Sequence, residues 1–328
     1  MKNVKVFYNE KSGNNDEDKV LKTIKDFFAR PENSASKLEF INPESPEDAI
    51  RLAKKASQDQ TDLVVALGGD GTINKICGGV FEGGAKPILG IVPNGTVNNL
   101  SKSLHIPQKL EEALNNLSQG EIQKFDIAKV NNDYMTSSLT LGILADIAQN
   151  VSGSEKKKFG PLAYLKDAYK VIRYNKTYRI KVKYNGKTKS LRTKLLLITM
   201  TDTIGGMQAL SPKAKVDDGL IRVYSLKEIN LFNILFHLNK LRRGKFDDFL
   251  EMTHFDTDHL EILTHSKKKK DNPYSRIDGD KSDPLPLDIK VYRKALNKRL
   301  SVNNRNKKSD LRLMTKSPIF GKIVLELN

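Results

Sequence analysis

Three glycines and one aspartate stand together in residues 68–72, which read Gly-Gly-Asp-Gly-Thr. Glycine allows positive φ and a close approach of ligand to backbone, and successive N–H groups in such a turn form an anion-binding nest. Asp70 lies inside the turn, where a carboxylate repels phosphate unless a cation lies between them. The motif therefore predicts a site for a metal-bound nucleotide. Taken singly, it has a plainer alternative, a tight turn with a surface aspartate.

Two other polar loops follow strands of the same kind. Residues 63–67, just before the glycine turn, form an unbroken apolar run that is typical of a strand buried on both faces. Residues 4–8 and 88–92 also read as strands, and the polar segments 9–13 and 94–98 follow them. Ligands of open parallel sheets bind beyond the carboxyl ends of the strands, so we expect the three loops to converge on one phosphate chain.

Helices must separate these strands if the sheet is parallel. Residues 16–30 carry apolar side chains at helical spacing. Residues 45–48, Ser-Pro-Glu-Asp, combine a hydroxyl N-cap, a proline at the first helical position and acids in the first turn. The alternation of strands and helices indicates an α/β domain with a doubly wound parallel sheet, which we assign to residues 1–125.

The pattern changes near Asp126, after which short β segments predominate. The β segments are 125–130, 134–139, 178–184, 195–200, 221–225, 260–264 and 287–292, and the two helices expected among them are 162–173 and 226–241. Asn185-Gly186 predicts a type I′ hairpin turn. We therefore predict a second, mostly β domain over residues 126–295. Residues 296–328 are expected to be a return segment and tail, for which packing on the first domain is one option.

The chain carries a strong positive charge. The 56 Lys and Arg residues against 39 Asp and Glu give a net charge of +17, which suits nucleic acid or an anionic membrane surface as a partner. No zinc-finger spacing or RNP-like box accompanies this charge. The single cysteine, Cys77, allows no disulfide within the chain, and neither a secretion signal nor a run of about 18 apolar residues occurs. A cytoplasmic protein without a membrane span is expected.

With these residues in view, the chain resembles the diacylglycerol kinase catalytic-domain family, in particular its soluble bacterial lipid kinases. The similar segments are the nucleotide loop 68–72, the first-strand loop with Asn9, Ser12 and Gly13, the third loop with Gly95, Thr96 and Asn98, the metal-holding turn 212–220, and Asp278-Gly279-Asp280. The glycine turn alone is also found in NAD kinases and phosphofructokinases. The ordered set is more specific.

The resemblance implies an α/β nucleotide domain and a β-sandwich domain with the active site in the cleft between them. The reaction it implies is transfer of the γ-phosphoryl group of ATP to a primary hydroxyl of a lipid, most simply diacylglycerol giving phosphatidic acid. The residues it assigns to ATP are Asn9, Ser12, Gly13, Gly68, Gly69, Gly71, Thr72, Gly95, Thr96 and Asn98.

The same resemblance assigns the acidic residues. Asp70 and Asp126 would hold or orient catalytic Mg²⁺, and Asp278 or Asp280 would accept the proton of the substrate hydroxyl. Asp218, with the carbonyl groups of Lys215 and Leu220, would hold a second, structural Mg²⁺. Asp280 stands where the family more often has glutamate, so its reach is one methylene shorter.

The acceptor and the partners stay open at this point. A polyprenol or a sphingoid base is an alternative lipid acceptor. The basic runs 156–158 and 267–270 would bring the protein to the anionic inner face of the membrane, with no nucleic acid as partner, and related enzymes suggest a homodimer. The competing functions are an NAD kinase-like kinase with a soluble substrate and a non-catalytic nucleotide-fold protein that binds nucleic acid.

Overall fold

The computed structural model describes residues 2–9, 17–35, 37–118, 120–142, 176–205, 211, 213–227, 252–264 and 273–301. The helices are α1 (Glu17–Ala29), the 3-10 turn η1 (Pro31–Asn33), α2 (Pro46–Gln58), α3 (Asp70–Glu82), α4 (Asn99–Ser103) and α5 (Leu110–Ser118). The strands are β1 (Asn3–Phe7), β2 (Lys37–Ile41), β3 (Leu63–Gly68), β4 (Ile88–Pro93), β5 (Gly120–Val130), β6 (Asp133–Met135), β7 (Ser138–Gly142), β8 (Tyr178–Tyr184), β9 (Lys187–Thr193), β10 (Leu195–Thr199), β11 (Ile221–Leu226), β12 (Met252–Thr257), β13 (His259–Thr264), β14 (Tyr274–Ile277), β15 (Asp280–Pro284) and β16 (Leu287–Ser301).

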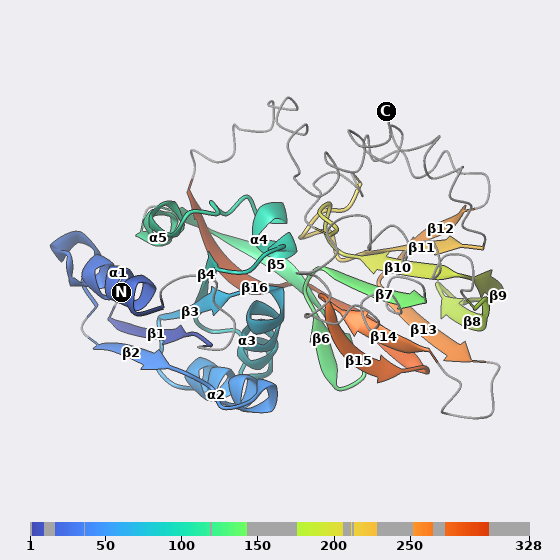
Figure 1. Cartoon of the computed structure of the whole chain (residues 1–328), viewed down its shortest axis with the longest axis horizontal. Helices are drawn as coiled ribbons and strands as arrows, with labels where there is room; N and C mark the ends of the chain where they lie inside the picture. The colour runs from blue at the N-terminus through green and yellow to red at the C-terminus, as the bar shows by residue number, and fades with distance from the viewer. Residues whose placement is uncertain are drawn as a thin grey trace, which may run out of the picture.

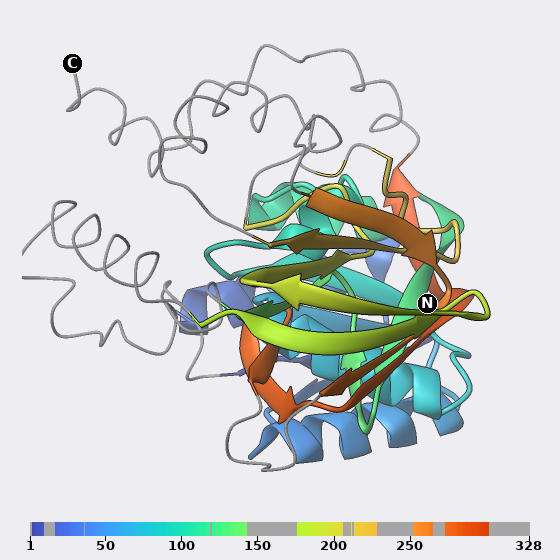
Figure 2. The ribbon, with the colours of Figure 1, turned by 90° about the vertical axis from the view of Figure 1, so that its right-hand side faces the viewer.

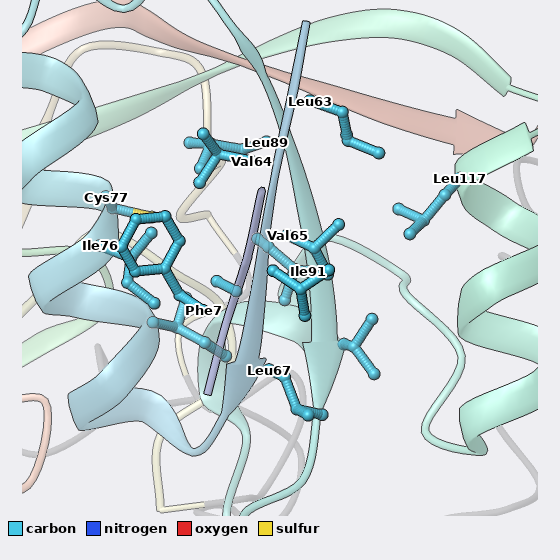
Figure 3. Close-up of a cluster of buried hydrophobic side chains, with 14 of the residues drawn as sticks. Phe7, Leu63, Val64, Val65, Leu67, Ile76, Cys77, Leu89, Ile91 and Leu117 are labelled. Atoms are coloured by element: carbon cyan, nitrogen blue, oxygen red, sulfur yellow. The ribbon is translucent and has the colours of Figure 1, made fainter. Parts of the chain in front are cut away.

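The N-terminal half is the predicted parallel sheet. Its strands lie in the order β2-β1-β3-β4, all parallel, and every residue of β3 is buried. Figure 3 shows apolar side chains of β3 and β4 packed between α3, which carries Ile76 and Cys77, and α5, which carries Leu117. The Ser45 hydroxyl accepts the N–H of Asp48 at 3.1 Å and Pro46 is the first residue of α2, so the predicted helix start is confirmed.

The C-terminal half is a β-sandwich. A six-stranded antiparallel sheet, in the order β12-β11-β10-β7-β14-β15, packs against β13, β8 and parts of β5 and β16. Between the two layers lies a second apolar core, to which Ile180 and Leu260 contribute from one sheet and Leu196 and Val223 from the other. Figure 1 shows the two halves side by side, and Figure 2 views the molecule from the sandwich end.

One strand joins the halves. β16 pairs in parallel with β4 through Lys298 and Leu89, and antiparallel with β5 and β13, so the parallel sheet and one layer of the sandwich form a single sheet. The predicted division between residues 125 and 126 falls inside β5. The first residues of the predicted return segment, 296–301, belong to β16, while 302–328 lie outside the described residues.

Two predicted elements were wrong in detail. The segment 134–139, expected as one strand, is broken between β6 and β7, and Thr136 and Ser137 lie in the break. The helix expected from residue 226 does not begin there, because Leu226 is the last residue of β11. The remainder of that helix, the helix at 162–173 and both predicted basic runs lie outside the described residues. The hairpin at Asn185-Gly186 is confirmed, with φ of 47° and 71°.

In the described part of the chain, every helix is too short or too polar to span a bilayer.

Lys298 is buried where the two halves join. Its ammonium group donates to the Leu104 carbonyl at 3.0 Å, and burial, opposed by Asp217, lowers its pKa to about 7. Between this value and the unfolded pKa of about 10.4, the unfolded chain binds a proton that the folded chain lacks. The destabilisation is therefore full below the folded pKa and is relieved as the pH rises toward the unfolded pKa.

Lys298→Met is expected to raise the free energy of unfolding by about 1 kcal/mol at neutral pH and by less at about pH 9.5. Urea unfolding at both pH values measures this difference. Lys124→Met, which removes an exposed lysine from the adjacent strand β5, is the matched control and should show no such gain. A Lys298→Met protein that is destabilised equally at both pH values would contradict the prediction.

Candidate active site

The glycine turn occupies the predicted place, between β3 and α3, but its glycines serve a different purpose. Gly68, Gly69 and Gly71 all have negative φ. What they provide is space, since a Cβ on Gly71 would come within 2.3 Å of the Asp280 Oδ2 atom. A Cβ on Gly95, in the loop after β4, would likewise lie 2.5 Å from the Gly69 Cα. Gly71 and Gly95 therefore leave room for Asp280 and Gly69, whereas a Cβ on Gly68 would meet Thr72 of the turn itself at 2.7 Å.

The loop after β4 is tied to the glycine turn. The Asn94 N–H donates to the Gly68 carbonyl at 2.9 Å. Asn98, with φ of 56°, closes its own loop: its Oδ1 accepts the Gly95 N–H at 3.1 Å and its Nδ2 donates to the Gly95 carbonyl at 2.9 Å. The Asn98 amide thus shapes the loop, while Thr96 is exposed.

The loop after β1 is only partly described. Asn9 directly follows Tyr8, whose N–H donates to the Ile41 carbonyl at 3.1 Å, and β1 lies beside β3 in the sheet. The carboxyl ends of β1, β3 and β4 therefore share one edge. Ser12 and Gly13 lie outside the described residues.

Asp70 is buried at the start of α3. Its two carboxylate oxygens accept the N–H groups of Asn99 at 3.1 Å and Leu100 at 3.3 Å, the first two residues of α4. Burial, reinforced by the negative charge of Asp278, raises the Asp70 pKa to about 6, although these backbone hydrogen bonds act in the opposite direction. In the described part of the chain, this buried acid forms no salt bridge.

The acidic segment at residues 278–280 forms the tip of a hairpin. Asp278 and Gly279, with φ of 50° and 96°, make a two-residue type I′ turn between β14 and β15. Asp280 is the first residue of β15, and its carboxylate lies against Gly71 of the glycine turn. Residues about 200 positions apart in sequence therefore meet at the junction of the two halves.

Asp278 is buried and its carboxylate is fully used. Its Oδ2 accepts the Asn74 Nδ2 at 2.7 Å and the N–H and hydroxyl of Thr136 at 2.8 and 2.9 Å. Its Oδ1 accepts the N–H and hydroxyl of Ser137 at 2.9 and 2.7 Å and the N–H of Ser138 at 2.8 Å. Two carboxylate oxygens offer about four lone-pair sites, so none of this acceptor capacity is left for a substrate proton. The network instead binds the hairpin to α3 and to the break between β6 and β7.

Asp280 has the opposite environment. It is exposed, and its carboxylate forms no hydrogen bond with the described residues. Partial burial of the carboxyl group against the glycine turn raises the Asp280 pKa. The positive charge of Lys75 lowers this pKa, and the negative charge of Asp278 raises it further. Lys75 itself is paired with Asp133 at 2.6 Å. Asp280 is therefore a free carboxylate with increased proton affinity, held beside the predicted phosphate loop.

Asp126 and Asp218 lie at a second place, around the turn at residues 216–219. Asp126 is buried, and its oxygens accept the N–H groups of Gly219 at 2.7 Å and Lys294 at 2.6 Å. Burial, together with the charges of Asp218 and Asp217, raises its pKa. Asp218 pairs with the guanidinium of Arg222, whereas Asp70 and Asp126 have no cationic partner among the residues that the structure describes.

Sequence reasoning missed Asn74, Thr136, Ser137 and Arg222. A signal was available only for their acceptor: Asp-Gly between β segments is the strongest short hairpin motif, and it would have placed Asp278 in a turn. Within the described residues, no three His, Cys, Asp or Glu side chains form a metal-binding cluster, so Asp70, Asp126 and Asp218 are not joined in one protein-only cage.

Comparison with known proteins gives a consistent result. Residues 3–130 match a model of the diacylglycerol kinase catalytic domain, and residues 137–298 match a model described as the YegS C-terminal NAD kinase β-sandwich-like domain. A Streptococcus pneumoniae serotype 4 protein, named as a candidate lipid kinase, is 30% identical over 295 residues, which cover 89% of this chain and 95% of its own. A diacylglycerol kinase of Staphylococcus aureus strain RF122 is 28% identical over 294 residues, or 88% of this chain and 89% of its own.

A crystal structure shows the same fold. It is that of a diacylglycerol kinase from Bacillus anthracis strain Sterne, with a TM-score of 0.73 at 22% identity, covering 92% of this chain and 98% of that one. The predicted fold class, a parallel-sheet domain followed by a β-sandwich, is confirmed.

The different environments of Asp278 and Asp280 can be tested by measuring the free energy of unfolding of variants. Asp278→Asn replaces one acceptor oxygen with an amide that faces buried donors, so we expect it to lower the free energy of unfolding by about 3 kcal/mol. Asp280→Asn should change it by less than about 0.5 kcal/mol, because that side chain is exposed. Urea unfolding of both variants measures the difference. Equal stabilities would show that the Asp278 network does not hold the hairpin.

Proposed function

Because the chain belongs to the diacylglycerol kinase family of lipid kinases, we propose that it transfers the γ-phosphoryl group of ATP to the primary hydroxyl of diacylglycerol, giving phosphatidic acid. The observation that carries this proposal is the contact between Asp280 and Gly71. A hydroxyl held by the sandwich and a phosphate chain held by the glycine turn would meet at this contact.

We assign phosphate binding to the loops at the carboxyl ends of the parallel strands. The N–H groups of residues 68–72 and the positive end of the 13-residue helix α3 favour an anion there. Gly95 lies against Gly69, and the hydroxyls of Thr72 and Thr96 can add donors. Phosphoryl transfer requires mainly positioning and charge neutralisation, which such a loop provides.

We assign Asp70 to hold the magnesium ion of the nucleotide, and Asp126, at the second place around residues 216–219, to orient the site around it. Both are buried carboxylates with a raised pKa and, among the described residues, without a salt-bridge partner, which suits acids that face a cation. When bound, Mg²⁺ neutralises the charge of the phosphate oxygens. Backbone N–H groups fix the direction of both carboxylates. Asp126 accepts two such hydrogen bonds and Asp70 accepts three, from residues 98–100, so each carboxylate keeps at least one of its about four lone-pair sites.

Asp280 is the proposed base. Its carboxylate accepts the proton of the lipid hydroxyl as the hydroxyl oxygen attacks the γ-phosphorus and ADP leaves. Asp278 positions it, because one hydrogen bond from Asn74 of α3 and five from residues 136–138 fix the hairpin tip. The aspartate reaches the glycine turn without the extra methylene of glutamate because Gly71 has no side chain.

Asp280→Asn is expected to lower kcat by at least about 100-fold with an unchanged fold, since general base catalysis contributes roughly 10²–10⁴-fold. Transfer of labelled phosphate from ATP to diacylglycerol in mixed micelles measures this. Asp283→Asn, an exposed acid of the same strand, should keep full activity.

An active Asp280→Asn enzyme would remove Asp280 as the base. NAD in place of diacylglycerol tests the soluble-substrate alternative, and NADP formation without phosphatidic acid would reject the lipid assignment.

A basic surface on the β8–β9 hairpin supports contact with an anionic membrane. Residues 176–194 contain six lysines and two arginines and no Asp or Glu. Arg179 lies directly opposite Arg192, and both are exposed. Like charges in this position destabilise a strand pair, and an anionic partner relieves the repulsion.

The double change Arg179→Glu with Lys181→Glu should lower partition onto vesicles containing anionic lipid by at least about tenfold, since each cation near such a surface contributes about 1 kcal/mol. Co-sedimentation measures this. Lys22→Glu with Lys25→Glu makes the same charge change on α1, at the opposite end of the molecule (Figure 1), and should have a much smaller effect. Equal losses in both variants would assign the effect to net charge and not to this hairpin.

A further inference from the structure

An arginine lies where a structural metal ion was predicted. Arg222, the second residue of β11, is buried, and its guanidinium binds both oxygens of Asp218, with Nη1 to Oδ1 at 2.9 Å and Nη2 to Oδ2 at 2.6 Å. The same group donates to the Leu220 carbonyl at 3.1 Å and the Lys213 carbonyl at 3.0 Å. Four hydrogen bonds therefore hold one cation inside the turn.

These acceptors overlap with the ligands of the predicted ion. The resemblance assigned the Asp218 carboxylate and the carbonyls of Lys215 and Leu220 to a second Mg²⁺, and Arg222 already binds the first and the last of these. Mg²⁺ requires a near-octahedral shell of oxygens at about 2.0–2.1 Å, which the same oxygens cannot supply while they accept N–H groups. A divalent cation would also lie beside a buried monovalent one. The donor set therefore does not fit the ion.

We infer that the guanidinium of Arg222 replaces the structural divalent cation in this protein, so that the turn at residues 213–220 is stable without metal. A second carboxylate adds to the attraction, because the Arg222 Nε lies 3.7 Å from Asp256 on the neighbouring strand β12. A bidentate guanidinium–carboxylate pair is also among the strongest hydrogen-bonded ion pairs in proteins.

The turn at residues 213–220, which Arg222 supports, contacts β5 and β16, the strands that connect the two halves. The Asp126 N–H donates to the Val216 carbonyl at 2.7 Å, and the Gly219 N–H donates back to Asp126. The Arg293 Nε of β16 donates to the Asp217 carbonyl at 3.3 Å. Arg222 therefore holds the turn that positions Asp126, and this conclusion does not depend on which reaction the protein catalyses.

The test is thermal unfolding of the nucleotide-free full-length protein with EDTA, with MgCl₂ and with CaCl₂. The wild-type Tm is expected to agree within about 1 °C in all three. Arg222→Ala should lower the Tm in EDTA by at least about 5 °C, and millimolar Mg²⁺ or Ca²⁺ should recover part of that loss, because the vacated oxygens then have room for an ion. Adding Asp218→Asn to Arg222→Ala should abolish the recovery.

Arg51→Ala is the matched control, since Arg51 pairs with Asp48 on the exposed face of α2. It should leave the Tm within about 1 °C and insensitive to metal. The inference is overturned if Arg222→Ala is as stable as wild type, or if the wild-type protein gains several degrees with metal and keeps that gain in the Asp70→Asn background. If Arg222→Ala does not fold, the wild-type measurement alone still tests whether a metal ion stabilises the turn. No step measures catalysis, so this inference can fail while the kinase proposal stands.

Discussion

The carboxylate of Asp278 is the interaction on which the arrangement of the site depends. It receives hydrogen bonds from Asn74 of the parallel-sheet half and from residues 136–138 of the sandwich half, and its own N–H donates to the Ser138 carbonyl at 2.8 Å. A buried charge with this many donors fixes the direction of each of them. The hairpin tip is thereby held at the N-terminal turn of α3, and the free carboxylate of Asp280 beside it reaches the glycine turn.

A second contact between separate segments lies at Asp126, and it too is made by a buried carboxylate. One buried carboxylate accepts N–H groups from two segments, Gly219 of the turn and Lys294 of β16. The two contacts use acids from different halves of the sequence, and in each the backbone supplies donors. Asp218 is stabilised differently, because the guanidinium of Arg222 on β11 provides a positive charge next to it. This chain thus has two buried acids that are held by backbone N–H groups and a third, Asp218, that is paired with an arginine.

The sequence allowed the parallel sheet, the glycine turn and the late acids to be predicted, because these depend on local patterns. It did not show what lies against the glycines: a Cβ on Gly71 would meet Asp280, about 200 positions away, and a Cβ on Gly68 would meet Thr72 of the turn itself. It did not distinguish Asp278 from Asp280 either, since their difference comes from Asn74 and Thr136. The expectation of one strand over residues 134–139 hid the break that supplies the donors, and nothing in the spacing of Arg222 reveals its contact with Asp218.

The continuity of β16 limits how the two halves can move. The strand belongs to both, and its pairing with β5 is interrupted only between Tyr292 and Leu296, where Lys294 has φ of 51°. Any opening or closing of the molecule must bend the chain at this bulge, because the regular ladders on either side resist it. Lys294 is also the residue whose N–H holds Asp126. A hinge motion would therefore reach Asp126 directly, without passing through the nucleotide loops.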